Sequence, residues 1–130
     1  MAIDRTVIDA PGAPPAAGPY SHAVRTGNLL FCSMQIPLDP GSGEIKGDSA
    51  ADQITVCLQN LSAIALAGGG SIDGAARLTV YITDMSAFAD VNEAYAEFFP
   101  ADPPARAAIG VTALPRGAQV AVDAVIALPA

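Results

Sequence analysis

The sequence is poor in basic residues. Its 130 residues include 13 acidic and six basic side chains, which gives a net charge of −7. The basic residues are scattered, with no two adjacent: Arg5, Arg25, Lys46, Arg77, Arg106 and Arg116. A nucleic-acid-binding surface needs a concentrated basic face that displaces counterions from phosphates. The composition therefore argues against a nucleic-acid partner.

Metal-binding side chains are also few, with two cysteines and one histidine. Cys32 and Cys57 lack the spacing of metal ligands, and His22 could not complete a zinc site with them. Their separation alone does not exclude a disulfide. Because free cysteine is among the most often buried residue types, we expect two buried thiols in a reducing compartment.

Long apolar segments are missing as well. No apolar run approaches the roughly 18 residues of a membrane-spanning helix. Asp4 and Arg5 precede a Pro/Ala/Gly stretch, which does not resemble a secretory signal. We therefore expect a cytoplasmic protein without a membrane partner. The length predicts a single domain over residues 1–130.

What the sequence does contain is a clear pattern of alternating strands and helices. Turn residues bound the apolar segments, and Ser49 or Asp48 can cap the first helix, which the run Gly68 to Gly70 ends. Residues 1–19 hold four prolines and are expected to be extended or turned. The predicted strands cover 28–36, 76–82, 107–112 and 119–128, and the predicted helices cover 49–67 and 86–99. This order predicts an α+β fold with both helices on one face of a mixed sheet.

The last predicted strand is apolar on both faces. One face carries Val120, Val122, Ala124 and Ile126, and the other carries Ala121, Asp123 and Val125. Two helices can cover only one face of the sheet. Since apolar residues make up 52% of the chain, we expect subunit contacts to cover the other face.

Two charges stand in apolar surroundings. Asp123 lies within the last strand, and Arg106 lies between a Pro-Pro-Ala segment and Ala107-Ala108-Ile109. Burying either charge is costly unless it is paired. One interpretation is a structural ion pair between them, or two solvated edge positions. The other is a pocket in which the planar guanidinium of Arg106 binds the carboxylate of a small substrate.

Several blocks of the sequence resemble one known family. They are GPYSHAV (18–24), GNLLFCSMQIPLDPGSGEIKGD (27–48), ITDMSAFADVNEAYAEFF (82–99) and PPAR (103–106). In this order they closely resemble the motifs of the reactive intermediate deaminase (RidA/YjgF) family. The resemblance implies a chorismate-mutase-like α+β fold assembled as a homotrimer with clefts between subunits. It also implies hydrolysis of reactive imine or enamine acids, such as 2-aminoacrylate, to 2-oxo acids and ammonia, without a cofactor or metal.

The resemblance assigns roles to single residues. Arg106 matches the family arginine that binds the substrate carboxylate, and Tyr20 matches a cleft tyrosine that orients substrate or water. Ser33 and Asn92 match two further substrate-binding positions, and the backbone amide of Ala108 can bond the carboxylate. The alternative is structural: packing for Tyr20, a strand-ladder position for Ser33, and a helix-surface or capping position for Asn92. His22 is interpreted as a bystander.

Three positions depart from the family pattern. Met34 replaces a glycine that lets the backbone approach a ligand, so its side chain must enter either the cleft or the core. Ala108 replaces a cysteine. Asp123 replaces a glutamate of the last strand. It is interpreted as the general base, although its side chain is one methylene shorter than that of glutamate. A displacement of about 1 Å at a catalytic group can cost around a hundredfold in rate.

These departures leave a second hypothesis open, a trimeric binding module for small carboxylates or 2-oxo acids that has lost turnover. A third, an endoribonuclease or translation inhibitor, is disfavoured by the acidic chain and the lone histidine.

Overall fold

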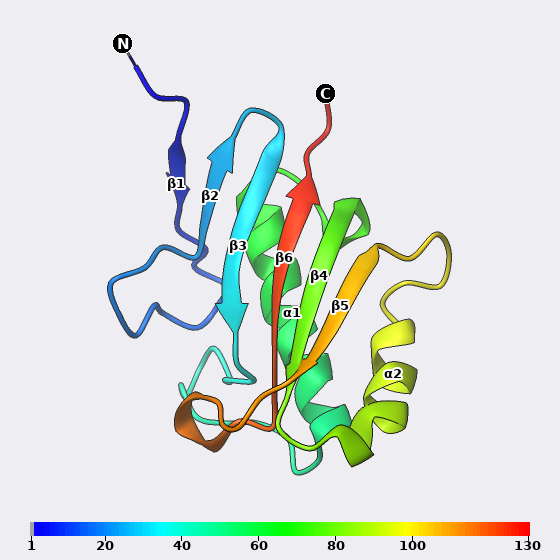
Figure 1. Cartoon of the computed structure of the whole chain (residues 1–130). Coiled ribbons are helices and arrows are strands. Elements are labelled where there is room, and N and C mark those ends of the chain that lie inside the picture. Colours follow the sequence, from blue (N-terminus) through cyan, green and yellow to red (C-terminus); the bar gives the residue numbers. More distant parts are fainter. Residues whose placement is uncertain (1) are drawn as a thin grey trace.

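A computed structural model describes residues 2–130 and shows one six-stranded mixed sheet with two helices on one face (Figure 1). Within these described residues, the spatial order of the strands is β1-β2-β3-β6-β4-β5, and only the β4–β5 pair is parallel. The bounds along the chain are β1 Thr6–Ile8, β2 Ala23–Thr26, β3 Leu29–Gln35, α1 Ala50–Ala67, β4 Ala75–Ile82, α2 Phe88–Ala96, β5 Ala105–Gly110 and β6 Val120–Ala127. The predicted α+β architecture is confirmed.

Helix α1 begins and ends where its sequence predicts. Ser49 is the N-cap, and its side chain accepts a hydrogen bond of 3.1 Å from the Asp52 amide. Gly69 follows the helix with a φ of +94°, a left-handed conformation that glycine adopts without strain. Between these ends, fully buried side chains recur at helical spacing and pack on the sheet: Ile54, Leu58, Leu61 and Ile64.

The core lies between α1 and the central strands. Alternate residues of β4 and β6 point into it, and each is at most 4% exposed: Leu78, Val80, Ile82, Val120, Val122, Ala124 and Ile126. The side chains between them point to the opposite, open face of the sheet. Strand β6 lies in the middle of the sheet, paired with β3 on one side and β4 on the other.

Helix α2 is shorter than the predicted 86–99. The Asp84 side chain accepts hydrogen bonds from the amide and hydroxyl of Ser86, and this turn opens a short 3-10 helix, Met85–Ala87, before α2. At the other end, the amides of Phe98 and Phe99 donate three residues back, to Tyr95 and Ala96. The last turn therefore tightens before Pro100, which cannot continue a helix.

Strands β1 and β2 were not predicted from the sequence, and β5 begins two residues earlier than expected. β2 and β3 form a hairpin in which Thr26 pairs with Leu29, so Gly27 and Asn28 are its two-residue loop. Gly27 has a φ of +58°. A Gly-Asn pair between two strand-forming segments was the signal that could have identified this hairpin.

None of the helices within residues 2–130 is long and apolar enough to cross a membrane. In that same part of the chain, no three His, Cys, Asp or Glu side chains are arranged to hold a metal ion.

Both cysteines are free and buried, as predicted. Burial, with a smaller contribution from the charge of Asp123, raises the pKa of Cys32 to about 12, and burial also raises the pKa of Cys57. Since the thiolate is the reactive form, we expect both thiols to react at least about tenfold more slowly with a disulfide reagent near pH 8 than in the denatured chain. A colorimetric thiol assay with and without denaturant measures this. Equal rates in both states would contradict the buried positions.

Candidate functional site

Arg106 lies on the edge strand β5 and faces helix α2. It pairs in register with Leu78 of β4, a core residue, so its side chain points to the helical side of the sheet. Its Nη1 donates a hydrogen bond of 2.6 Å to Oδ1 of Asn92. The guanidinium carbon lies 5.4 Å from the ring centre of Phe88 and 5.0 Å from that of Tyr95. Arg106 and Asn92 are thus brought together as one cluster.

The charge of Arg106 has no acidic partner within residues 2–130. The close acid–base contacts in this part of the chain join Asp9 to the His22 ring and Asp39 to Lys46, and Arg106 belongs to neither. A guanidinium carries five N–H donors, and Asn92 is a neutral acceptor that engages one of them. The exposed guanidinium can therefore bind a carboxylate through its remaining donors. The structural ion pair with Asp123 is therefore wrong within this chain, whereas the other form of that interpretation, a solvated edge position, fits Arg106, which is exposed on an edge strand.

Asp123 lies on the other face of the sheet. It pairs in register with Thr79 of β4 and is half-buried on the open face. The Tyr81 hydroxyl donates a hydrogen bond of 2.7 Å to its Oδ2. Within one protomer, Asp123 and Arg106 therefore do not face the same space.

The hydrogen bond to Asp123 raises the pKa of Tyr81 above its ordinary value of 10. The folded state then holds this proton more tightly than the unfolded state does. The stabilisation is fully present below pH 10 and is lost as the pH rises through the higher folded value. We expect Tyr81→Phe to lower the free energy of unfolding by about 1 kcal/mol near neutral pH, and this difference to shrink above pH 10. Denaturant titrations of both proteins across this range measure it, and a difference that grows above pH 10 would contradict the assignment.

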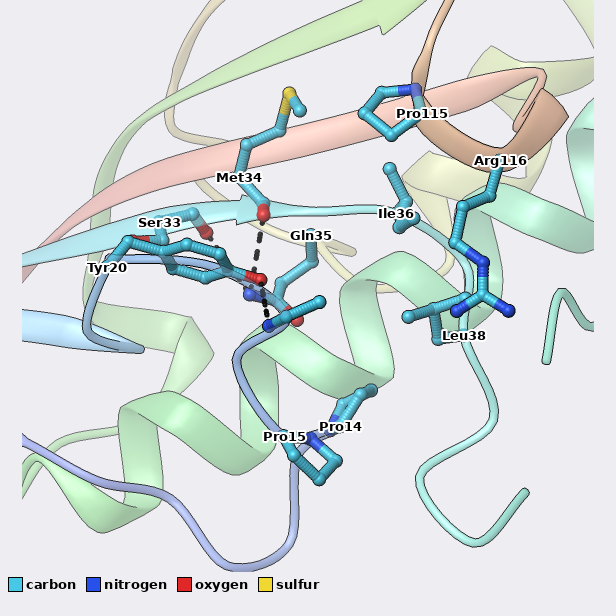
Figure 2. Close-up of a pocket in the computed structure, with 11 residues that line it drawn as sticks. Pro14, Pro15, Tyr20, Ser33, Met34, Gln35, Ile36, Leu38, Pro115 and Arg116 are labelled. Atoms are coloured by element: carbon cyan, nitrogen blue, oxygen red, sulfur yellow. Dashed lines mark hydrogen bonds between the residues drawn. The ribbon is translucent and has the colours of Figure 1, made fainter. Parts of the chain in front are cut away.

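A second cluster surrounds a cavity of about 490 Å³ at the other end of the sheet (Figure 2). Its lining residues come from the N-terminal segment, from β3 with the loop after it, and from the turn before β6: Pro14, Pro15, Ala17, Tyr20, Ser33, Met34, Gln35, Ile36, Leu38, Pro115 and Arg116. Three predicted site residues, Tyr20, Ser33 and Met34, are among them.

An irregularity in strand β3 positions Ser33 and Met34 at the wall of this cavity. The register between β3 and β6 shifts between Cys32 and Gln35, so Ser33 and Met34 lie in a bulge. Ser33 donates a hydrogen bond of 2.6 Å to the Ser21 carbonyl, and the Tyr20 hydroxyl accepts one of 3.2 Å from the Ala17 amide. In Figure 2 the Met34 side chain points away from the Tyr20 ring. The wall of the cavity is mostly apolar, and its polar groups are largely bonded to the chain itself.

His22 fixes the N-terminal part of this wall, a role that the sequence did not indicate. It is only 5% exposed. Its Nδ1 accepts a hydrogen bond of 2.9 Å from the Ala10 amide, so its Nε2 carries the proton and donates to the Pro14 carbonyl at 2.7 Å. This one ring holds residues 10–14 against the start of β2.

The two clusters do not meet on one protomer. Strands β6 and β4 lie between β3 and β5. At the usual strand spacing, the distance from β3 to β5 is about 14 Å. Arg106 and Asn92 lie at one edge, with Ala108 half-buried two residues further along β5. Tyr20, Ser33 and Met34 lie around the cavity, and Asp123 lies on the open face. The structure therefore presents two separate clusters, each a candidate half-site, and the Asp123 carboxylate on the face opposite Arg106.

Comparison with known proteins agrees with this fold and with these motifs. The sequence profile of the family described as Endoribonuclease L-PSP matches residues 10–128. RutC family protein y4sK of Sinorhizobium fredii is 48% identical over 120 residues, which cover 92% of this chain and 93% of that protein. The 2-iminobutanoate/2-iminopropanoate deaminase of Mus musculus is 40% identical over 123 residues, which cover 95% of this chain and 91% of that protein.

A solved structure of Escherichia coli TdcF with bound serine has a TM-score of 0.90 at 37% identity, covering 95% of this chain and 99% of that one. This chain, whose sheet carries both helices on one face, therefore shares its α+β fold with a class of small homologous proteins. The chain belongs to the reactive intermediate deaminase (RidA/YjgF) family.

Proposed function

We propose that this protein hydrolyses imine or enamine forms of 2-amino acids to 2-oxo acids and ammonia, with Arg106 binding the substrate carboxylate. The observation that carries the proposal is the exposed guanidinium of Arg106, which has a neutral partner in Asn92 and no acidic partner within residues 2–130. The naming of the mouse relative as an imine deaminase supports the reaction class.

The reaction needs positioning and the transfer of two protons from the water oxygen to nitrogen. With its carboxylate held, the imine presents its C=N carbon to water. Attack by water, with one of its protons passing to nitrogen, gives a carbinolamine. The C–N bond then breaks as the hydroxyl proton also passes to nitrogen, which releases ammonia and leaves the C=O group of the 2-oxo acid. Because imines of this kind hydrolyse readily in water, a modest lowering of the barrier suffices.

We further propose that the complete site forms between protomers of a homotrimer. The separation of the Arg106 cluster from the cavity containing Tyr20 and Ser33 supports this, because a substrate of a few atoms cannot span the sheet. The open face of the sheet also exposes apolar side chains, including Phe31 at 45% and Ile109 at 45%, which a neighbouring subunit would cover. The small carboxylate substrate would then contact two chains. A cytoplasmic location also stays a prediction.

Asp123 is proposed as the group that activates water, and it could do so only across a subunit boundary. In its own chain it accepts the Tyr81 hydrogen bond on the face opposite Arg106. This same observation favours the second candidate function, a carboxylate-binding module without turnover, because Oδ2 of Asp123 is already occupied by the Tyr81 hydroxyl and lies away from Arg106 of the same chain.

A coupled assay decides between the two. An amino-acid oxidase generates the imine, semicarbazide competes for it, and release of the 2-oxo acid is followed. Acceleration by the wild type but not by Asp123→Asn supports hydrolysis with Asp123 as the base. Binding of 2-oxobutyrate by calorimetry without any acceleration would support the binding module. Cleavage of purified RNA that disappears in Arg106→Ala would overturn both.

Replacing Asn92 tests the neutral partner of Arg106. We expect Asn92→Asp to place a carboxylate where Oδ1 now lies, 2.6 Å from Nη1, and so to compete with the substrate for the guanidinium. Binding of 2-oxobutyrate should weaken about five- to tenfold. The isosteric change alters little besides charge. Asn92→Ala is the control, with a smaller loss, and equal losses in both variants would contradict the competition.

A further inference from the structure

The side chain of Arg106 lies on a stripe of helix α2 made by three residues. Phe88, Asn92 and Tyr95 are four and three residues apart, a spacing that places them on one face of the helix. The guanidinium carbon lies over both rings, at 5.4 and 5.0 Å from their centres, and Asn92 accepts its hydrogen bond between them. The guanidinium is therefore contacted by two aromatic rings and one amide oxygen from a single helix.

We propose that Phe88 and Tyr95 are positioning residues, whose rings hold the guanidinium so that the edge not bonded to Asn92 faces the substrate carboxylate. The proposal rests on carboxylate binding by Arg106 in the proposed function. A single hydrogen bond to Asn92 leaves the long arginine side chain free to rotate about that contact. Two rings that attract the cation through their faces restrict this rotation.

Tyr95 is the rigid member of this pair. It is 6% exposed, and its ring packs on that of Phe99 at 5.0 Å with an interplanar angle of 44°. Its hydroxyl has no hydrogen-bond partner within residues 2–130. The ring, and not the hydroxyl, therefore accounts for the contact with Arg106.

The position of Arg106 in the sheet makes such support necessary. Within residues 2–130, strand β5 is the edge strand and pairs only with β4, and Arg106 is exposed. In this part of the chain no further strand lies on the outer side of the arginine. Helix α2 is thus the element that determines where the guanidinium points.

The test compares Tyr95→Leu, which removes the ring, with Tyr95→Phe, which removes only the hydroxyl. Phe88→Leu removes the second ring, and Val91→Ala serves as a control that perturbs the core side of the same helix, where Val91 is 1% exposed. We expect the Kd for 2-oxobutyrate to rise about three- to tenfold in each leucine variant, with Tyr95→Phe retaining wild-type affinity. Val91→Ala should lower the melting temperature without changing Kd.

A second measurement needs no ligand. The Nε–Hε resonance of Arg106, assigned by its absence in Arg106→Lys, should be shifted upfield by the rings in the wild type and in Tyr95→Phe, and should move downfield in Tyr95→Leu. Wild-type affinity in both leucine variants, or the same resonance position in all three proteins, overturns the proposal. A wild type that neither binds 2-oxobutyrate nor accelerates imine hydrolysis contradicts the proposed function instead. The resonance then decides the positioning role alone.

Discussion

Arg106→Ala should lower imine hydrolysis, or the affinity for 2-oxobutyrate, by about 100-fold. The guanidinium has free donors for a two-bonded contact with a carboxylate, and each charge-assisted hydrogen bond is worth about 1.5 kcal/mol or more. Two such bonds amount to about 3 kcal/mol, or roughly two powers of ten in an equilibrium constant. Parallel assays of purified wild type and variant measure the loss. The fold should persist, because Arg106 is exposed and belongs to no ion pair in the described part of the chain.

Arg106→Lys is the matched control for this prediction. Lysine retains the positive charge but lacks the planar fork and its contacts with the two rings. We expect an intermediate loss of about tenfold. Wild-type behaviour of Arg106→Ala would refute carboxylate binding by this residue. If lysine restored full activity, charge alone would be sufficient and the geometry at α2 would be unimportant.

Two inactive variants should restore activity to each other when they are assembled into the same trimers. Arg106→Ala disables one half-site and Tyr20→Ala disables the other, and the structure separates these halves by two intervening strands. In trimers co-expressed from equal amounts of both chains, about one quarter of the interfaces would pair two intact halves. Activity should therefore recover to about a quarter of the wild-type value, far above either variant alone.

The control mixes the two variants after separate purification, without subunit exchange, and should show no recovery. Co-expression of Arg106→Ala with the double variant Arg106→Ala/Tyr20→Ala is a second control, since no interface then has an intact Arg106 and no recovery is expected. An absence of recovery in verified mixed trimers would show that one protomer contains the whole site.

Much of the fold could be predicted because it depends on local patterns. The recurrence from Ile54 to Ile64, capped by Ser49 and ended by the glycine run, is sufficient for α1. The alternation in β6 divided its side chains between two faces, but both faces are apolar, so the sequence alone could not show which of them packs against the helices. β1 and β2 could not be recognised in this way, since they are three and four residues long and mostly exposed. Their pairing depends on β3 and on the Gly27-Asn28 turn.

The site could be predicted only in part. The sequence singled out Arg106 and Asn92, and the structure brings them together because β5 is parallel to β4 and α2 lies beside it. The sequence did not indicate that Asp123 and Arg106 lie on opposite faces of the sheet. This arrangement depends on the register of two different strand pairs. The ring contacts of Arg106 were also missed, although Phe88 and Tyr95 share the helical spacing of Asn92. Such contacts depend on side-chain direction across two elements that are ten or more residues apart.

The central place of β6 has a consequence for how the protein is made. Residues 120–127 pair with both β3 and β4, which lie far earlier in the chain. Until these residues have left the ribosome, β3 and β4 have no partner between them, and their apolar faces stay open. The sheet must therefore close late, through contacts between distant parts of the chain, which is a slow step in folding. During synthesis, the half-finished sheet therefore has unpaired strand edges and exposed apolar side chains, which are the features that promote aggregation.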